Sequence, residues 1–143
     1  AVDELGHTHH REHCLWRTAE SGLLADAPAS CPHGGHGIQT AGPVWLGATC
    51  EPAFVEGVAG ALEDSFGTAD RSHSLLDTLA AELDEPTHYD QHRLCESWGR
   101  SATAMEEFLG ALRSAGFSAS RAHYAGTAFK TDATVSEIEA ATG

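Results

Sequence analysis

The stretch LRSAGFSASRAHYAGTAFKTDAT, Leu112–Thr134, contains the end of one helix and two β-like runs. Gly116 stands at the position where glycine commonly ends a helix. The runs Phe117–Tyr124 and Thr127–Thr131 follow it and are joined by Ala125-Gly126. This stretch therefore predicts a helix that leads into a two-stranded ribbon.

Upstream of this stretch, apolar residues recur at helical spacing. The helices expected along the chain cover residues 52–66, 70–83, 90–98 and about 103–115, with a last one from about 134. Gly99 should end the third helix, and Thr103 with Glu106 has the spacing of a capping box for the fourth. The side chains expected on the buried face of the fourth helix are Met105, Phe108, Leu109 and Leu112.

Helix, turn, helix and ribbon is the order of a winged helix, which implies contact with nucleic acid. The basic residues expected to make this contact lie at the end of the second helix of that unit and on the ribbon: Arg113, Arg121, His123 and Lys130. We expect their guanidinium and ammonium groups to face solvent. A winged helix can also serve only for packing, and the residues alone leave both interpretations open.

Residues 1–41 are rich in histidine, glycine and short polar residues and show no helical periodicity, which predicts a loop-dominated module. Cys14 and Cys31 have a separation found between the knuckles of zinc ribbons. The histidines that flank them are His7, His9, His10, His13, His33 and His36. A Cys2His2 zinc site, weak or non-zinc binding, and simple solvated histidines all remain open, whereas Cys50 and Cys95 are expected to be buried small hydrophobes.

The charge of the chain is strongly acidic. Eight Lys and Arg residues stand against 21 Asp and Glu, for a formal net charge of −13, and Lys130 is the single lysine. Such a surface suits a salt-rich cytoplasm, because at about 1 M salt the Debye length falls to about 3 Å and self-repulsion is screened. The same screening means that net charge does not exclude an RNA partner.

The sequence contains no GxGxxG, P-loop, GxSxG or HExxH motif, so we expect no complete catalytic site in this chain. It also has no apolar run long enough to span a bilayer and no signal-peptide pattern, which predicts a soluble protein of the cytoplasm. The chain begins with alanine, as expected of a processed chain or of a segment of a longer protein.

Three segments resemble the C-terminal domain of the archaeal tRNA (guanine 26-N2)-dimethyltransferases. They are AGPVWLG (Ala41–Gly47), ELDEPTHYDQHRL (Glu82–Leu94) and the stretch Leu112–Thr134 quoted above. The overall expectation is an α+β chain. Its predicted parts are a small, degenerate zinc-ribbon-like module over 1–48 and a helical, winged-helix-like tRNA-binding domain over 49–143.

The resemblance also implies a reaction. That family transfers methyl groups from S-adenosylmethionine to guanine 26 of tRNA, and it does so with an N-terminal methyltransferase domain that this sequence lacks. The chain is therefore expected to hold tRNA beside that partner domain and to be inactive alone. Arg121, His123 and Lys130 would contact phosphate or sugar, and Trp45 would pack inside the fold.

In the resembled family, two Cys-x-x-Cys knuckles bind zinc. Arg11 and Gly34 stand where two of those cysteines would be, and Cys14 and Cys31 match the other two. The resemblance thus implies zinc at Cys14 and Cys31, with His33 or His36 as the substitute ligand.

Two alternatives belong to other classes of protein. One is a winged-helix DNA-binding regulator with a histidine-rich metal-sensing arm, which should dimerise. The other is a degenerate remnant without activity. A methyltransferase domain should instead expose an apolar patch for its missing neighbour.

Overall fold

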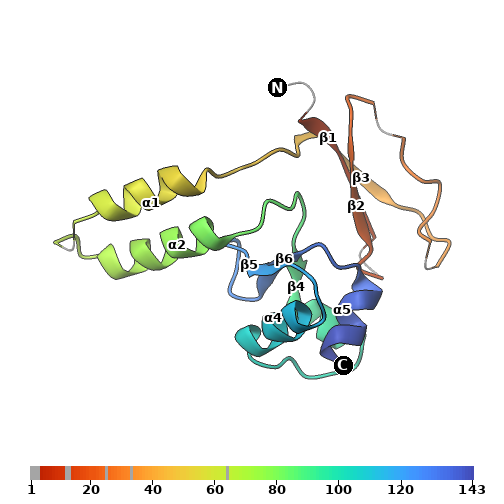
Figure 1. Ribbon diagram of the computed structural model, residues 1–143. Helices are drawn as coiled ribbons and strands as arrows, with labels where there is room; N and C mark the ends of the chain where they lie inside the picture. Colours follow the sequence, from red (N-terminus) through yellow and green to blue (C-terminus); the bar gives the residue numbers. More distant parts are fainter. Residues whose placement is uncertain (1–3, 12–13, 25, 33, 64) are drawn as a thin grey trace.

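The computed structural model describes residues 4–11, 14–24, 26–32, 34–63 and 65–143 (Figure 1). Its strands are β1 (Leu5–His10), β2 (Arg17–Ser21), β3 (Gln39–Trp45), β4 (Tyr89–Asp90), β5 (Ala119–Arg121) and β6 (Ala128–Thr131). Its helices are α1 (Pro52–Ala61), α2 (Ala69–Ala81), α3 (Gln91–Ser97), α4 (Met105–Ser114) and α5 (Val135–Thr142). These elements form an N-terminal sheet, a helical hairpin and a C-terminal unit, and the chain is α+β as expected.

The N-terminal sheet has the antiparallel order β2-β1-β3. The prediction of a loop-dominated module is confirmed only in part, because β1, β2 and the start of β3 form a sheet, although most described residues among 1–41 lie outside strands. Polar side chains form part of the buried side of this sheet. His7 and His9 on β1 are 6% and 1% exposed, and Nδ1 of His9 lies 2.9 Å from Oγ1 of Thr40 on β3. These histidines are therefore buried strand residues instead of solvated loop residues.

The C-terminal unit combines the sheet β4-β6-β5 with α3, α4 and α5. The predicted buried face of α4 is confirmed, since Met105, Phe108, Leu109 and Leu112 are all buried. Phe129 of β6 is fully buried, and its ring packs edge-on against Phe108 with centroids 5.2 Å apart. The predicted order of helix, helix and ribbon is present, and β4 adds a strand to the ribbon.

The helix boundaries test several local predictions. Gly99 and Gly116 follow the ends of α3 and α4 with φ of 67° and 96°, the left-handed region in which glycine is favoured. The capping box predicted for α4 is wrong, because Ala104 occupies its N-cap position. A capping box is instead present at the start of α5, where Thr134 and Glu137 bond each other's backbone.

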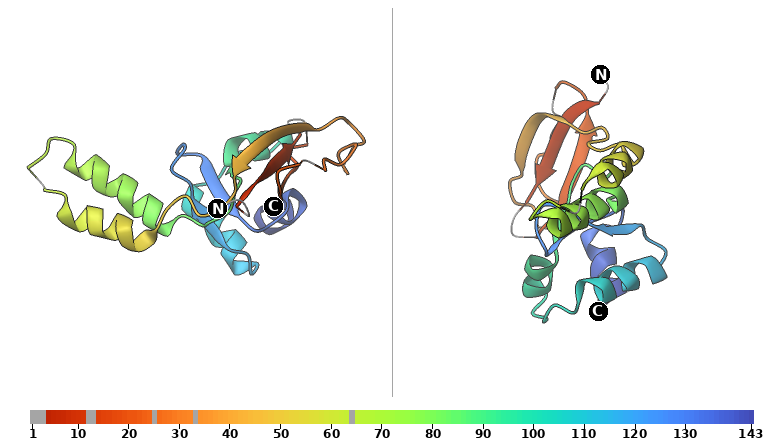
Figure 2. Two further views of the ribbon diagram at one scale, coloured as in Figure 1. Left: turned by 90° about the horizontal axis from the view of Figure 1, so that it is seen from above. Right: turned by 90° about the vertical axis from the view of Figure 1, so that its left-hand side faces the viewer.

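The hairpin of α1 and α2 extends to one side of the rest of the chain in two perpendicular views (Figure 2). α1 ends at Ala61, earlier than predicted, and Val55 is its buried residue. The expected apolar stripe is largely solvent-facing: Phe54, Val58, Phe66 and Leu75 are 70%, 40%, 57% and 48% exposed.

Contacts join the N-terminal sheet to the C-terminal unit. Leu15 is part of the main hydrophobic core, together with Tyr89 and Ile138. The Arg17 guanidinium lies 4.2 Å from the centre of the Tyr89 ring, and burial lowers the pKa of Arg17.

Trp45 is 46% exposed, so it packs less fully than expected, and its Nε1 donates to the Ala48 carbonyl. A division at residue 48 stays a prediction. No helix in the described ranges has both the length and the apolar character that a membrane span requires.

Candidate nucleic-acid interface

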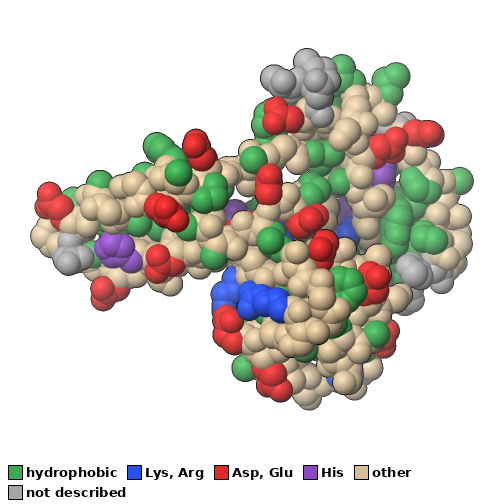
Figure 3. Space-filling model, viewed as in Figure 1, with side chains coloured by type: hydrophobic (Ala, Val, Ile, Leu, Met, Phe, Trp, Pro, Cys, Tyr) green, Lys and Arg blue, Asp and Glu red, His purple; other side chains and the backbone are tan. Residues whose placement is uncertain are grey.

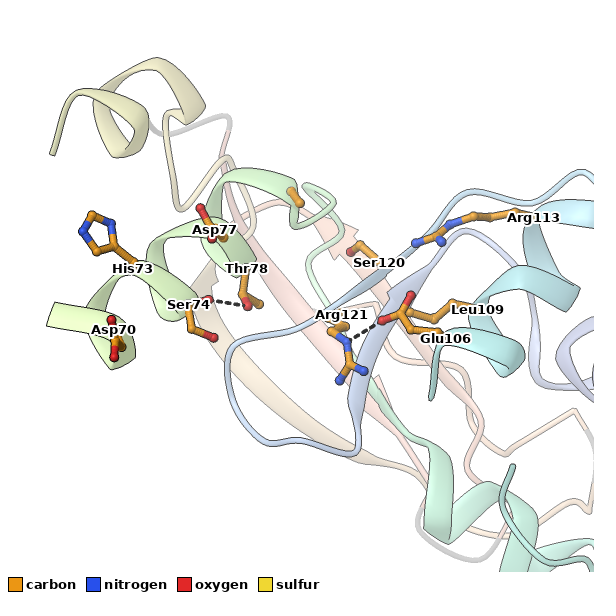
Figure 4. Close-up of a pocket in the computed structure, with 11 residues that line it drawn as sticks. Asp70, His73, Ser74, Asp77, Thr78, Glu106, Leu109, Arg113, Ser120 and Arg121 are labelled. Atoms are coloured by element: carbon orange, nitrogen blue, oxygen red, sulfur yellow. Dashed lines mark hydrogen bonds and ion pairs between the residues drawn. The ribbon is translucent and has the colours of Figure 1, made fainter. Parts of the chain in front are cut away.

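A groove lies between α2, α4 and the β5 strand, with a volume of about 550 Å³. Figure 4 shows its two walls: Asp70, Ser74 and Thr78 come from α2, whereas Arg121 and Glu106 come from the C-terminal unit. The groove therefore exists only because the helical hairpin lies against that unit. It brings together two of the predicted site residues, Arg113 and Arg121.

Arg121 is an exposed cation in this groove. Its Nε lies 2.7 Å from Oε1 of Glu106, and the two side chains are 43% and 67% exposed. An ion pair with such access to solvent contributes about 1 kcal/mol or less, because water competes for both charges. A phosphate group could replace the carboxylate at little cost.

The Arg113 side chain is held by a backbone carbonyl. Its Nε and Nη2 both donate to the Ala119 carbonyl, at 3.0 and 2.7 Å. This fork fixes the end of α4 against β5 and orients the guanidinium at the groove wall. Arg113 therefore provides a fixed positive charge with part of its hydrogen-bonding capacity already used.

Lys130 differs from the expectation that its ammonium faces solvent. Its side chain is 5% exposed, and Nζ lies 2.9 Å from Oε1 of Glu82, whose side chain is also 5% exposed. In a strand with one exposed face, alternate side chains would face solvent, but all the residues of β6 are buried. The ammonium is thus committed to a carboxylate inside the fold.

His123 shares this carboxylate. Its backbone N–H donates to Oε2 of Glu82 at 2.8 Å, and its Nδ1 lies 2.9 Å from the same oxygen. Burial alone would raise the pKa of Glu82, but the hydrogen bonds from Lys130 and His123 outweigh it and hold that pKa below its usual value. Glu82 therefore links the end of α2 to the ribbon, and the His123 ring remains at the surface.

Arg71 on α2 is an exposed cation that was not among the predicted site residues. A second cavity of about 240 Å³ has Arg71, Arg121 and His123 among its lining residues. Figure 3 shows basic side chains gathered where the hairpin joins the C-terminal unit, with acidic side chains beside them. Arg71 gave no local signal, because its proximity to Arg121 depends on how the hairpin folds back.

The predicted metal residues are brought together only in part. Sγ of Cys14 and Sγ of Cys31 lie 3.1 Å apart. A Cβ atom placed on Gly34 would lie 3.2 Å from Cδ2 of His36, so that imidazole lies beside the position of a missing cysteine. His33 lies outside the described residues. Within the ranges that the structure describes, no three His, Cys, Asp or Glu side chains are arranged to hold a metal ion.

The predicted burial of the two remaining cysteines is confirmed for Cys95 but not for Cys50. Cys95 is 5% exposed within the main core, as expected of a small hydrophobe. Cys50 is only half-buried and lines a groove beside Phe54 and Tyr124.

A helix pair and a ribbon lie beside a groove whose lining includes Arg113 and Arg121, and arginines so placed can contact phosphate. The same lining includes three carboxylates, Asp70, Asp77 and Glu106. The model of the family "N2,N2-dimethylguanosine tRNA methyltransferase" matches residues 1–142, and the chain belongs to this family. The resemblance drawn from its sequence is confirmed.

Similar proteins include the tRNA (guanine(26)-N(2))-dimethyltransferase of Haloarcula marismortui, 58% identical over 99% of this chain and 38% of that protein. The protein of the same name from Halobacterium salinarum is 51% identical over 99% of this chain and 38% of its own length. A solved structure, Trm1 from Pyrococcus horikoshii with S-adenosyl-L-methionine, matches with a TM-score of 0.80. It is 26% identical, and the match covers 98% of this chain and 35% of that one. The chain thus spans little more than a third of these relatives.

Proposed function

We propose that this chain is the tRNA-binding part of a tRNA (guanine 26-N2)-dimethyltransferase. The complete enzyme would transfer methyl groups from S-adenosylmethionine to guanine 26 of tRNA. The relatives carry this name, and the chain spans about 38% of their length. S-adenosylmethionine would be bound by the methyltransferase domain in the part of the relatives that this chain does not span, so the chain alone would be inactive. The family match favours this function over a DNA-binding regulator.

The observation that carries the proposal is the groove between α2 and the C-terminal unit. Arg71, Arg113 and Arg121 line it or the adjoining cavity, although the chain has only eight Lys and Arg residues in total. The groove lining also includes the carboxylates Asp70, Asp77 and Glu106, so the proposal rests on direct arginine–phosphate contacts and not on the net charge of the groove. Folded RNA is recognised largely through backbone and shape, which suits arginines that can contact phosphate oxygens.

The roles of the predicted residues follow from their surroundings. Arg121 and His123 would contact phosphate or sugar directly, because both are solvent-accessible on the ribbon. Arg113 would add positive charge at the wall. Lys130 would act through Glu82 by fixing the ribbon, since its ammonium is buried against that carboxylate. On this proposal the unit over residues 89–131 works as a winged-helix-like module.

The decisive experiment uses the complete enzyme with tRNA and S-adenosylmethionine. Changing both Arg71→Ala and Arg121→Ala should weaken tRNA binding by roughly tenfold or more, because two phosphate contacts are lost. Methyl transfer at saturating tRNA should be nearly unchanged, since neither residue touches the reacting atoms. Arg93→Ala is the matched control, because it removes one exposed arginine of α3 that lies outside both cavities. Equal affinity of the double variant and the control would refute the interface.

The exposed apolar face of the hairpin would be the contact for the methyltransferase domain. Phe54, Val58, Phe66 and Leu75 leave large apolar side chains in water, as expected of a surface that another domain covers. This face lies on the same hairpin as Arg71, so docking of that domain would bring its active site close to bound tRNA.

The proposal extends to the cellular setting. The acidic surface and the tRNA substrate fit a soluble enzyme of a salt-rich cytoplasm, where screening removes most of the self-repulsion. Zinc held by Cys14 and Cys31 with His33 or His36 stays a prediction from the sequence, and among the residues that the structure describes no three such side chains are arranged to hold a metal ion.

A further inference from the structure

Cys14 and Cys31 lie close together in loops that connect the strands of the N-terminal sheet. The tRNA-binding proposal does not use these two residues. Cys14 follows β1, and Cys31 lies in the loop between β2 and β3, yet their sulfur atoms are 3.1 Å apart. Cys31 is 2% exposed, whereas Cys14 is half-buried and reachable from solvent. Turn hydrogen bonds fix the Cys31 loop: its N–H donates to the His36 carbonyl, and its carbonyl accepts from Gly34 and Gly35.

Arg11 crosses the same gap between the two loops. Its Nη1 donates to the Gly37 carbonyl at 3.0 Å, so the guanidinium lies between the knuckle after β1 and the knuckle before β3. Arg11 occupies the sequence position at which the resemblance places a cysteine ligand, and a guanidinium does not ligate zinc. The described residues therefore do not fit a four-ligand zinc site.

We propose that Cys14 and Cys31 form a reversible intramolecular disulfide that ties these two loops together. The oxidant would be a low-molecular-weight disulfide such as oxidised glutathione. The Cys14 thiolate attacks one sulfur of that disulfide, which gives a mixed disulfide and releases one thiol. The Cys31 thiolate then attacks the Cys14 sulfur and releases the second thiol. Overall two protein thiols are oxidised, one small disulfide is reduced to two thiols, and the protons pass to those thiols.

The geometry favours ring closure over a stable mixed disulfide. A sulfur–sulfur bond is about 2.05 Å long, so the two atoms need to approach by roughly 1 Å. Cys31 is already beside Cys14 in a fixed turn, which gives the second attack a high effective concentration.

The bond would act on the fold through Leu15. This residue follows Cys14 directly, is 8% exposed and belongs to the core that also contains Tyr89. Tying Cys14 to the Cys31 loop would hold the segment that connects the N-terminal sheet to the C-terminal unit. The oxidised chain should therefore resist unfolding better than the reduced chain.

The test equilibrates the full chain in glutathione buffers of graded redox potential, traps free thiols by alkylation and maps the peptides by mass spectrometry. We expect a peptide pair linked through Cys14 and Cys31, with neither Cys50 nor Cys95 in a disulfide-linked peptide at any potential. Oxidation should raise the midpoint of thermal unfolding by on the order of 5 °C. The double variant Cys50→Ser, Cys95→Ser should keep the linkage, and Cys14→Ser should abolish it.

Two outcomes would overturn the proposal. One is a glutathione adduct that persists at Cys14 while Cys31 stays free. The other is one zinc ion per chain by elemental analysis, with both thiols protected from alkylation until a chelator is added. Mapping the unsubstituted chain decides the matter even if Cys14→Ser fails to fold. Neither outcome bears on tRNA binding, which is measured separately.

Discussion

The Nζ atom of Lys130 lies 2.9 Å from Oε1 of Glu82, and the side chains of both residues are 5% exposed. Burying this pair joins the residue after α2 to the central strand of the C-terminal sheet. His123 shares the carboxylate, so Glu82 contacts both the central strand and the ribbon turn, beside a second link in which the Leu83 N–H donates to Oγ of Ser120 at 2.9 Å. The walls of the proposed tRNA groove depend on these contacts.

Removing the charge of Glu82 should destabilise the fold. Glu82→Gln leaves the Lys130 ammonium buried without a counter-charge, and breaking a buried pair in this way costs about 3–5 kcal/mol. The free energy of unfolding from urea titration at constant salt measures the loss.

Glu107→Gln is the matched control, since it removes one exposed carboxylate of α4 and should change stability by about 0.5 kcal/mol or less. The double variant Glu82→Gln, Lys130→Met should recover part of the stability. A loss in Glu82→Gln no larger than that of the control would show that the pair is not a structural contact.

The same pair predicts an acid-sensitive fold. The folded-state pKa of Glu82 is lowered, so its stabilising contribution is complete above the usual carboxyl pKa and is lost as the pH falls through the folded value. Asp90 acts in the same direction, because hydrogen bonds from Thr127 and the Arg93 N–H outweigh its burial and lower its pKa. Unfolding free energies measured from pH 7 down to pH 3 should fall, and the fall should be smaller in Glu82→Gln. Parallel curves for the two proteins would contradict this assignment.

The C-terminal unit was easier to predict from the sequence than the N-terminal sheet. The helices and the ribbon of the C-terminal unit were predictable, because Phe108, Leu109 and Leu112 keep a helical period and glycines mark the ends. The strand β1 was missed because its buried positions include His7 and His9, which break the apolar alternation expected of a strand.

The candidate site shows a similar limit. The ribbon residues were found because they lie close together in sequence, but the burial of Lys130 depends on Glu82, which comes from the end of a distant helix. Arg71 was missed for the same reason, since its role depends on tertiary contact between α2 and the ribbon turn. Local patterns identify elements, whereas these pairings arise only when the hairpin folds onto the unit.

Neutralising Glu106 should strengthen tRNA binding. Glu106→Gln removes the carboxylate that holds Nε of Arg121 at 2.7 Å and also removes a negative charge from the groove. An exposed pair is worth about 1 kcal/mol, so affinity for tRNA should rise by up to about fivefold. Filter binding or fluorescence anisotropy with the complete enzyme measures the change.

Glu107→Gln again provides the control, because it makes the same charge change on α4 outside the lining of that groove. A gain of equal size in both variants would mean that the effect comes from overall charge. Glu106→Gln combined with Arg121→Ala should lose the gain if it acts through that arginine.

The exposed face of the hairpin should matter only when the rest of the enzyme is present. Phe54→Ser and Val58→Ser remove two side chains that are 70% and 40% exposed, so the isolated chain should keep its stability to within about 1 kcal/mol. In the complete enzyme the same changes should lower the thermal midpoint and raise the KM for tRNA, because the two domains would no longer be held together. Limited proteolysis should then release the domains faster.

The matched control is Leu24→Ser, which changes an 88% exposed residue of the N-terminal sheet region and should leave the complete enzyme unchanged. If both sets of variants behaved alike in the complete enzyme, the hairpin face would not be the docking surface.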